Sequence, residues 1–211
     1  MQRQDAETLE GWLTGALLPG WIARVYRPDR PGFVESVAPD GSPLESGIRT
    51  TLVTARLAYA FSHGHCLGVP GALAAARHGM DFLWERCRRP DGRFSHRCTP
   101  EGDPVDARSD FYDLAFVLFA CGWFARASGE ALWLARAEET MVFLERELSH
   151  PAGGFAEDTL GTLPRRQNPH MHLLEACHAL WESSGDRRWL DRAEAMVALM
   201  HARMLDPASR S

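Results

Sequence analysis

Apolar residues recur at helical spacing along most of the chain, and this pattern predicts an all-α protein. One leading helix and three pairs of helices account for the pattern. They are expected at about 4–18, at 47–66 with 70–86, at 110–127 with 130–147, and at 169–183 with 186–204. No alternation of the strand type is longer than the small hairpins expected in the loops between helix pairs.

The helix pairs form a repeat. The segments PGFVE, DGRFSH and GGFAED each precede a pair, and their aromatic residues Phe33, Phe94 and Phe155 are spaced 61 and 61 residues apart. The second pair matches the third at an offset of 56 residues, as Trp133 and Trp189 illustrate. The first pair matches the second at an offset of 61 residues, with fewer identical positions. Helical hairpins that repeat in this way bury their apolar faces by stacking, so an open solenoid or a closed toroid is expected.

The connections between pairs predict where a site would lie. The long segments 87–109 and 148–167 both lead from the second helix of one pair to the first helix of the next. They therefore gather at one end of the stack, where function tends to concentrate. The second helices, such as 130–147, are amphipathic and predict an outer, solvated layer. The first helices are then inner, and their polar residues converge on a central cavity.

Composition narrows the class of protein. With 45% hydrophobic and 24% charged residues, 1–211 has the composition of one globular domain or part of one. A net charge of −5 without a basic stripe argues against nucleic acid as a partner. The chain has no lysine, which excludes Schiff-base chemistry and a lysine general base. Neither a signal peptide nor a stretch of 18 apolar residues is present, so no membrane partner is expected.

The cysteines indicate a reducing environment. Their number is odd and their spacing is wide, so neither a disulfide framework nor a zinc site is predicted, and a cytoplasmic location is expected. The five are Cys66, Cys87, Cys98, Cys121 and Cys177.

Candidate chemistry concentrates in the segment RRQNPHMHLLE at 165–175, where polar residues open an apolar helix. Asn168 is a suitable N-cap, and Pro169 fits the first helical position. Residues three and four apart share a helix face, so Asn168, His172 and Glu175 line one side while His170 points elsewhere. The two histidines are therefore not expected to bind one metal ion.

Each candidate also has a structural interpretation. A histidine such as His172 in a first turn is commonly a capping or surface residue, and Glu175 could be a buried carboxylate bound by a neighbouring helix. Arg56, on an apolar helix, either reaches solvent or binds an anion or hydroxyl group. Tyr112 and Asp113 lie where simple capping of a helix start would place them. The functional interpretation gains weight because all five residues lie on the expected inner helices.

These segments resemble the N-acylglucosamine 2-epimerase superfamily, and its D-mannose isomerase-like branch in particular. The specific match is RRQNPHMHLLEA at 165–176. Further matches span most of the chain: PGFVESVAPDGSP, TARLAYAFS around Arg56, FYDLAFVLFA around Tyr112, and GGFAEDTLGTLPRRQN. The resemblance implies an (α/α)6 toroid, of which three repeat units and a leading helix would form about half.

The resemblance also implies a site and a reaction. Arg56 would hold a sugar oxygen, Tyr112 would be a pocket aromatic, Asn168 would bind a hydroxyl group, and Glu175 would complete the substrate-binding face. His172 would be the catalytic histidine near the reacting carbons. Family members need no metal or organic cofactor; they remove the C2 proton of a ring-opened monosaccharide or disaccharide and return it through a cis-enediol. Histidine suits such a base near neutral pH, and an arginine suits the developing enediolate.

Departures from the family pattern set limits on this expectation. Leu52 stands where tryptophan is frequent, and Leu114 stands where histidine is frequent. The family's acid/base pair of histidines comes from later inner helices, beyond Ser211. The 211-residue chain is therefore expected to be an incomplete, weakly active or inactive form, and a homodimer would cover the open half ring.

Two other functions remain open at this stage. Toroids of this kind also host glycoside hydrolases, which need a carboxylate pair that Asp110, Asp113 and Glu175 could supply. A non-catalytic sugar-binding or partner protein is the other alternative, which an incomplete ring makes more credible.

Overall fold

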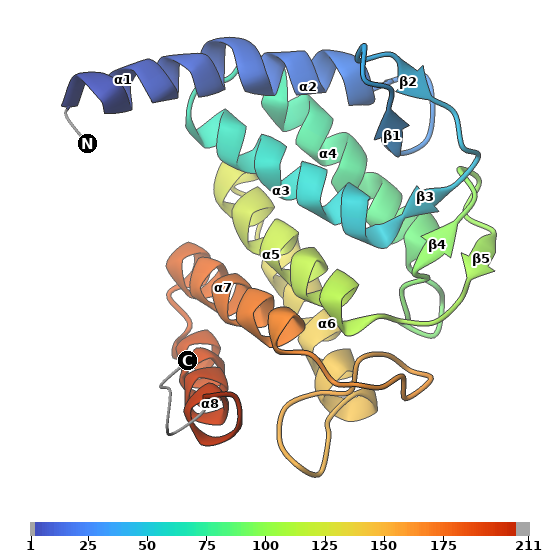
Figure 1. The fold of residues 1–211 in the computed structure, drawn as a ribbon, viewed down its shortest axis with the longest axis vertical. Coiled ribbons are helices and arrows are strands. Elements are labelled where there is room, and N and C mark those ends of the chain that lie inside the picture. The colour runs from blue at the N-terminus through green and yellow to red at the C-terminus, as the bar shows by residue number, and fades with distance from the viewer. Residues whose placement is uncertain (1–2, 206–211) are drawn as a thin grey trace.

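The computed structural model describes residues 3–205, and helical pairs follow one another around an open arc (Figure 1). The leading segment comprises α1 (Arg3–Trp12), a π-helical turn η1 (Leu13–Leu17) and α2 (Leu18–Val25). The pairs are α3 (Thr51–Cys66) with α4 (Ala72–Phe82), α5 (Phe111–Ser128) with α6 (Leu132–Glu147), and α7 (Gln167–Ser184) with α8 (Arg187–Arg203). A second π-helical turn, η2 (Leu83–Cys87), extends α4. The predicted all-α architecture is confirmed.

The pairs form two layers. Helices α3, α5 and α7 pack side by side as the inner layer, and α4, α6 and α8 each pack on the outside of their own partner. Helix α5 is almost wholly buried, since it has an inner neighbour on both sides. A Cβ atom on Gly122 of α5 would lie 3.1 Å from the backbone nitrogen of Leu180 on α7, so these two helices approach closely there. The Oγ atom of Ser183 also donates to the Gly122 carbonyl at 2.8 Å.

The leading helix is longer than expected. The sequence predicted a helix end near residue 18, but the helix continues through Pro19 to Val25. The wider turn η1 precedes this proline, which has no N–H to donate. Val25 is buried, and Leu18 and Ile22 pack against the core, so tertiary contacts stabilise the added turns.

Short strands, which the sequence placed only in loops, lie beside the starts of the inner helices. Strands β1 (Ser36–Val37) and β2 (Pro43–Leu44) form a hairpin, and β3 (Arg49–Thr50), β4 (Arg97–Cys98) and β5 (Pro104–Asp106) form an antiparallel sheet in that order. Because β3 occupies residues 49–50, α3 begins at Thr51 rather than at 47.

The repeated phenylalanines anchor the loops. Phe33, Phe94 and Phe155 are all buried. The ring of Phe33 packs edge-on against Phe61, with centroids 5.6 Å apart, and Phe155 packs against Phe111 at 5.1 Å. The period seen in the sequence therefore marks the point at which each long loop is fixed to its helix pair. No helix in the described part of the chain is long and apolar enough to cross a membrane, and all five cysteines are free.

Candidate functional site

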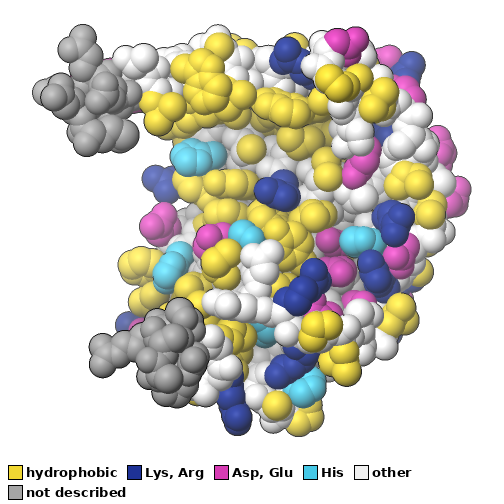
Figure 2. Space-filling view, viewed as in Figure 1, with side chains coloured by type: hydrophobic (Ala, Val, Ile, Leu, Met, Phe, Trp, Pro, Cys, Tyr) yellow, Lys and Arg dark blue, Asp and Glu magenta, His cyan; other side chains and the backbone are white. Residues whose placement is uncertain are grey.

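The inner helices arrange their side chains in layers. Thr50, Asp110 and Arg166 are the N-caps of α3, α5 and α7, so residues at equal distances from these caps lie at the same level. We call the end of the cavity where these helices begin its mouth. The first layer from the mouth is Leu52, Tyr112 and Asn168, and the second, which we call the central layer, is Arg56, Phe116 and His172. The third layer is Tyr59, Phe119 and Glu175, and the fourth is His63, Trp123 and Ala179. Figure 2 shows hydrophobic side chains gathered on the hollowed face, with basic and histidine side chains among them.

His172 lies at the centre of this wall. Its ring centroid is 4.7 Å from that of Phe116 and 5.2 Å from that of Tyr112. Its Nε2 atom lies 3.5 Å from the Tyr112 hydroxyl oxygen. The side chain is 18% exposed, so it is packed on two sides yet open to the concave face.

Glu175 orients His172. Its Oε2 atom lies 2.7 Å from His172 Nδ1, one helical turn away on the same face, as the spacing predicted. A carboxylate accepts only, so the Nδ1–H group donates to it, and Nε2 is left as the atom that can accept a proton. Burial and, second, the charge of Glu175 raise the pKa of Tyr59, which belongs to the same layer.

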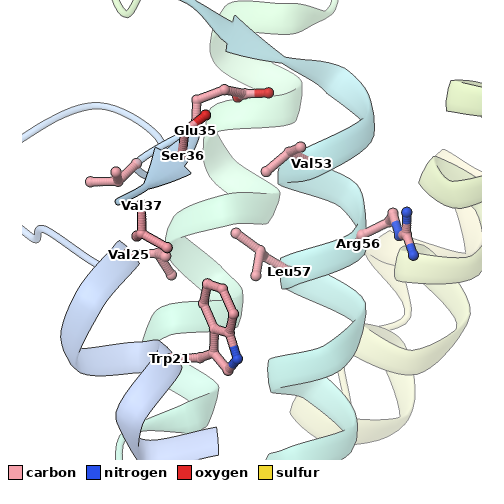
Figure 3. A pocket seen from close by; sticks show the side chains of 9 residues that line it. Trp21, Val25, Glu35, Ser36, Val37, Val53, Arg56 and Leu57 are labelled. Carbon is pink, nitrogen blue, oxygen red and sulfur yellow. The ribbon is translucent and has the colours of Figure 1, made fainter. Parts of the chain in front are cut away.

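Arg56 completes the central layer. Its guanidinium carbon lies 5.1 Å from the centroid of Phe116, whose ring therefore lies between Arg56 and His172. The side chain is exposed, and within the described residues no carboxylate or carbonyl pairs with it. Figure 3 shows Arg56 directed toward α5, away from the other labelled residues of the adjoining pocket. Its five N–H groups are free to bind a ligand on the concave face.

Asn168 is exposed in the first turn of α7, at the level of Tyr112, but it is not the N-cap. The helix begins two residues earlier than expected, at Gln167, after the cap residue Arg166. A residue outside the helix sets this earlier start. The buried Glu157 accepts hydrogen bonds from the backbone nitrogen and from Nε of Arg166, and so fixes Arg166 as the cap. Asn168 is therefore exposed on the helix face without a hydrogen-bond partner among the described residues, and its binding role stays a prediction.

His170 faces away from the cavity, as expected. It is buried, its Nδ1 atom donates to the Arg166 carbonyl at 3.0 Å, and its Nε2 atom accepts from the backbone nitrogen of Phe155 at 3.1 Å. Burial lowers its pKa, which favours the neutral ring that these two bonds require. His170 thus holds the loop before α7 in place.

Apart from Tyr112, sequence reasoning overlooked the aromatic residues of α5 and α3 that form the wall. Tyr112, Phe116, Phe119 and Trp123 are spaced four, three and four residues apart, a stripe that was visible in the sequence. Phe119 stacks on Tyr59 at 4.3 Å between centroids, and Trp123 stacks on His63 at 4.0 Å. Such apolar ring faces suit the C–H faces of a sugar.

The carboxylates proposed for a hydrolase are already engaged. Asp110 caps α5 by accepting from the Tyr112 backbone nitrogen at 2.9 Å. Asp113 is buried, and its Oδ2 atom lies 2.7 Å from His96 Nδ1. Burial raises the pKa of Asp113 to about 6. Among the residues that the structure describes, no group of three His, Cys, Asp or Glu side chains could hold a metal ion.

A pocket of about 250 Å³ adjoins the wall on the far side of α3. Its lining is mostly apolar and comes from α2, β1 and α3, as Figure 3 shows. Trp21, Val25, Val37, Val53 and Leu57 contribute side chains to it.

The amino-acid sequence is similar to those of known proteins over most of its length. A mannose-6-phosphate isomerase of Rhizobium meliloti (strain 1021) is 33% identical over 210 residues, which cover 97% of this chain and 54% of that protein. A D-mannose isomerase of Thermobifida fusca is 35% identical over 166 residues, covering 72% of this chain and 39% of that protein. The chain thus spans about half the length of these relatives.

Solved structures show the same fold. The cellobiose 2-epimerase from Spirochaeta thermophila DSM 6192 superposes with a TM-score of 0.85 at 25% identity, covering 94% of this chain and 54% of that structure. A glycoside hydrolase family 76 mannosidase from Bacteroides thetaiotaomicron VPI-5482 has a TM-score of 0.64 at 15% identity, with 76% and 46% covered, and shares the fold alone. The helix pairs are therefore half of an (α/α)6 toroid. Residues 32–210 match the model of the N-acylglucosamine 2-epimerase (GlcNAc 2-epimerase) family, and the chain belongs to that family.

Proposed function

We propose that this chain contributes one wall of a sugar isomerase or 2-epimerase site that acts on mannose-type sugars. The observation that carries the proposal is the central layer, where His172, held at Nδ1 by Glu175, and Arg56 flank the ring of Phe116. The relatives include a D-mannose isomerase and a cellobiose 2-epimerase, which supports a sugar as the substrate class. We also propose that residues 1–211 form a single domain.

The chemistry follows from the positions of these groups. Proton removal from C2 of an open-chain aldose needs a base beside the carbonyl group, and Nε2 of His172 is the available basic atom. Arg56 supplies positive charge for the oxygen on which the enediolate charge develops. The Tyr112 hydroxyl and the Asn168 amide can bind sugar hydroxyls at the mouth. Return of the proton to C1 gives a ketose, and its return to the opposite face of C2 gives the epimer.

The proposal also covers how fast the chain turns over sugar and in which compartment the protein is located. Because an open wall leaves the reacting sugar in contact with water, we expect weak turnover from the half ring alone. The free cysteines agree with a reducing compartment such as the cytoplasm, which is part of the proposal.

The test is exchange of the C2 proton of D-mannose with D2O, followed by NMR. Exchange detects proton abstraction even when little product accumulates. We expect slow exchange by the wild-type chain, its loss in His172→Gln, and its retention in His201→Gln, which changes an exposed histidine on α8. Exchange that persists in His172→Gln contradicts the proposal.

A non-catalytic sugar-binding role is the second candidate, and the unpaired guanidinium of Arg56 on an open wall favours it. Binding of D-mannose that Arg56→Ala abolishes, without any C2 exchange, identifies this role. Release of reducing sugar from mannosides would instead indicate a hydrolase, against which the engaged Asp110 and Asp113 argue.

A further inference from the structure

A second histidine is held by a carboxylate in the same way as His172. His96 Nδ1 lies 2.7 Å from Asp113 Oδ2, and His172 Nδ1 lies at the same distance from Glu175 Oε2. The side chain of His96 is 19% exposed, and that of His172 is 18% exposed. Both rings are therefore packed on most sides and reach solvent along one edge.

Asp113 determines which edge of the His96 ring is free. Its side chain is buried, and its Oδ1 atom has no hydrogen-bond partner among the described residues. Because a buried carboxylate is costly without a partner, the contact with Nδ1 is strongly favoured and fixes the ring. No residue in the described part of the chain bonds to Nε2 of His96, yet this atom is not among the buried polar atoms that lack a partner. Nε2 is therefore the ring nitrogen that reaches solvent.

His96 lies between the first turns of α3 and α5, at the mouth of the cavity. It directly precedes β4, beside the start of α3 (Figure 1), and its carbonyl oxygen accepts from the backbone nitrogen of Thr51 at 3.2 Å. Asp113 directly follows Tyr112 of the first layer along α5. Helix α3 packs between α2 and α5, and α5 packs between α3 and α7. The position of His96 is thus fixed by elements in the middle of the arc.

The outer side of this segment is covered. Ser95, just before His96, is buried, and its backbone nitrogen donates to the carbonyl oxygen of Cys87 at 2.9 Å. Cys87 is the buried last residue of η2, which continues the outer helix α4. The free edge of His96 therefore opens toward the mouth.

The spacing of the layers indicates which part of a sugar would reach His96. First-layer residues precede those of the central layer by four positions on each inner helix, so the two levels are about 6 Å apart at a rise of about 1.5 Å per residue. When C2 lies beside His172, C6 is four carbon–carbon bonds away, and an extended chain of bonds of about 1.5 Å each spans about 5 Å. Deeper in the cavity, the ring of Phe119 stacks on that of Tyr59. The polar end of the sugar is therefore expected at the mouth.

We propose that His96 is a substrate-binding residue that determines specificity for the C6 hydroxyl group of the sugar, which it binds through Nε2. This assignment rests on the proposed function, since it starts from a sugar with C2 beside His172. A hydroxyl group both donates and accepts, so it can bind Nε2 whether or not that nitrogen carries a proton. Asp113 is then a positioning residue, which holds His96 as Glu175 holds His172.

The test compares the binding of D-mannose with that of 6-deoxy-D-mannose, which lacks this hydroxyl group alone, by NMR titration. Wild type is expected to bind D-mannose about 5-fold more tightly, the effect of one hydrogen bond. His96→Asn removes Nε2 but keeps an amide N–H group near the position of Nδ1 for Asp113, so it should bind both sugars equally. His65→Asn, which changes a partly exposed histidine in the last turn of α3, is the matched control and should keep the preference.

Exchange of the C2 proton in the same proteins separates this inference from the proposed function. Exchange by wild type together with an unchanged preference for D-mannose in folded His96→Asn overturns the role of His96 and leaves the proposed function intact. A preference that depends on His96 without any exchange supports the role of His96 in binding and contradicts the proposed function. Equal binding of the two sugars by wild type, a comparison that needs no variant, also overturns the assignment. Circular dichroism shows whether His96→Asn is folded.

Discussion

Glu175 Oε2 lies 2.7 Å from His172 Nδ1, and the two residues are one turn apart on the concave face of α7. The carboxylate fixes which imidazole nitrogen carries the proton and how the ring is turned, which leaves Nε2 beside the Tyr112 hydroxyl. This geometry makes Glu175 a positioning residue for His172. The substrate-binding role expected for Glu175 stays a prediction.

Replacement of Glu175 by Gln tests that assignment. The amide can present an N–H group to Nδ1 and favour the wrong tautomer, so we expect kcat for mannose turnover or C2 exchange to fall about 10-fold or more, with KM little changed. Glu182→Gln, an exposed glutamate two turns further along α7, is the control. A change confined to KM would instead assign Glu175 to substrate binding.

Arg56 provides a test of sugar binding. Because no described residue forms an ion pair with it, Arg56→Ala should lower the melting temperature only slightly, through the lost contact with the Phe116 ring. The loss of charge-assisted hydrogen bonds should weaken sugar affinity about 10-fold or more, measured by titration calorimetry. Arg126→Ala is the matched control, since Arg126 also lies over an aromatic ring, that of Trp123 at 5.4 Å. Equal losses in the two variants would contradict a specific role for Arg56.

The buried pair of Asp113 and His96 is expected to contribute to stability. His96→Ala leaves the Asp113 carboxylate buried without its partner, while its other oxygen already has none among the described residues. We expect a loss of about 2 kcal/mol in the free energy of unfolding at pH 7, measured by urea denaturation. Asp113→Asn keeps an acceptor for His96 and removes the buried charge, so its cost should be smaller. A larger cost for Asp113→Asn would show that the charge itself stabilises the fold.

His170 predicts a pH dependence of stability. Burial lowers its pKa in the folded protein below the ordinary value of 6.5, so below that value the unfolded chain binds the proton more readily. The stabilisation from neutral His170 is complete above pH 6.5 and is lost as the pH falls toward the folded pKa. The free-energy difference between wild type and His170→Gln should therefore narrow from pH 7.5 to pH 5.5. A difference that widens toward acid would mean that the ring is charged in the fold.

Much of the fold could be predicted because helical spacing is a local property. A pair of helices was expected at 110–127 and 130–147, and α5 and α6 occupy nearly the same residues. The predicted helix ends were wrong where a contact with a residue distant in the sequence determines the end of the helix. The leading helix was expected to end near residue 18, but packing of α2 on the core extends it to Val25. Helix α7 was expected to begin after Asn168, but the hydrogen bonds from Arg166 to Glu157 place its start at Gln167.

The sequence by itself determined the repeat, the inner and outer layers, and the shared helix face of His172 and Glu175, because each follows from periodicity along one chain segment. Only the tertiary structure decided that Phe116 lies between Arg56 and His172 and that His96 pairs with Asp113. Those relations join residues of different segments. Their geometry depends on how closely the helices pack, and close approach at residues such as Gly122 is what brings the side chains of the wall together.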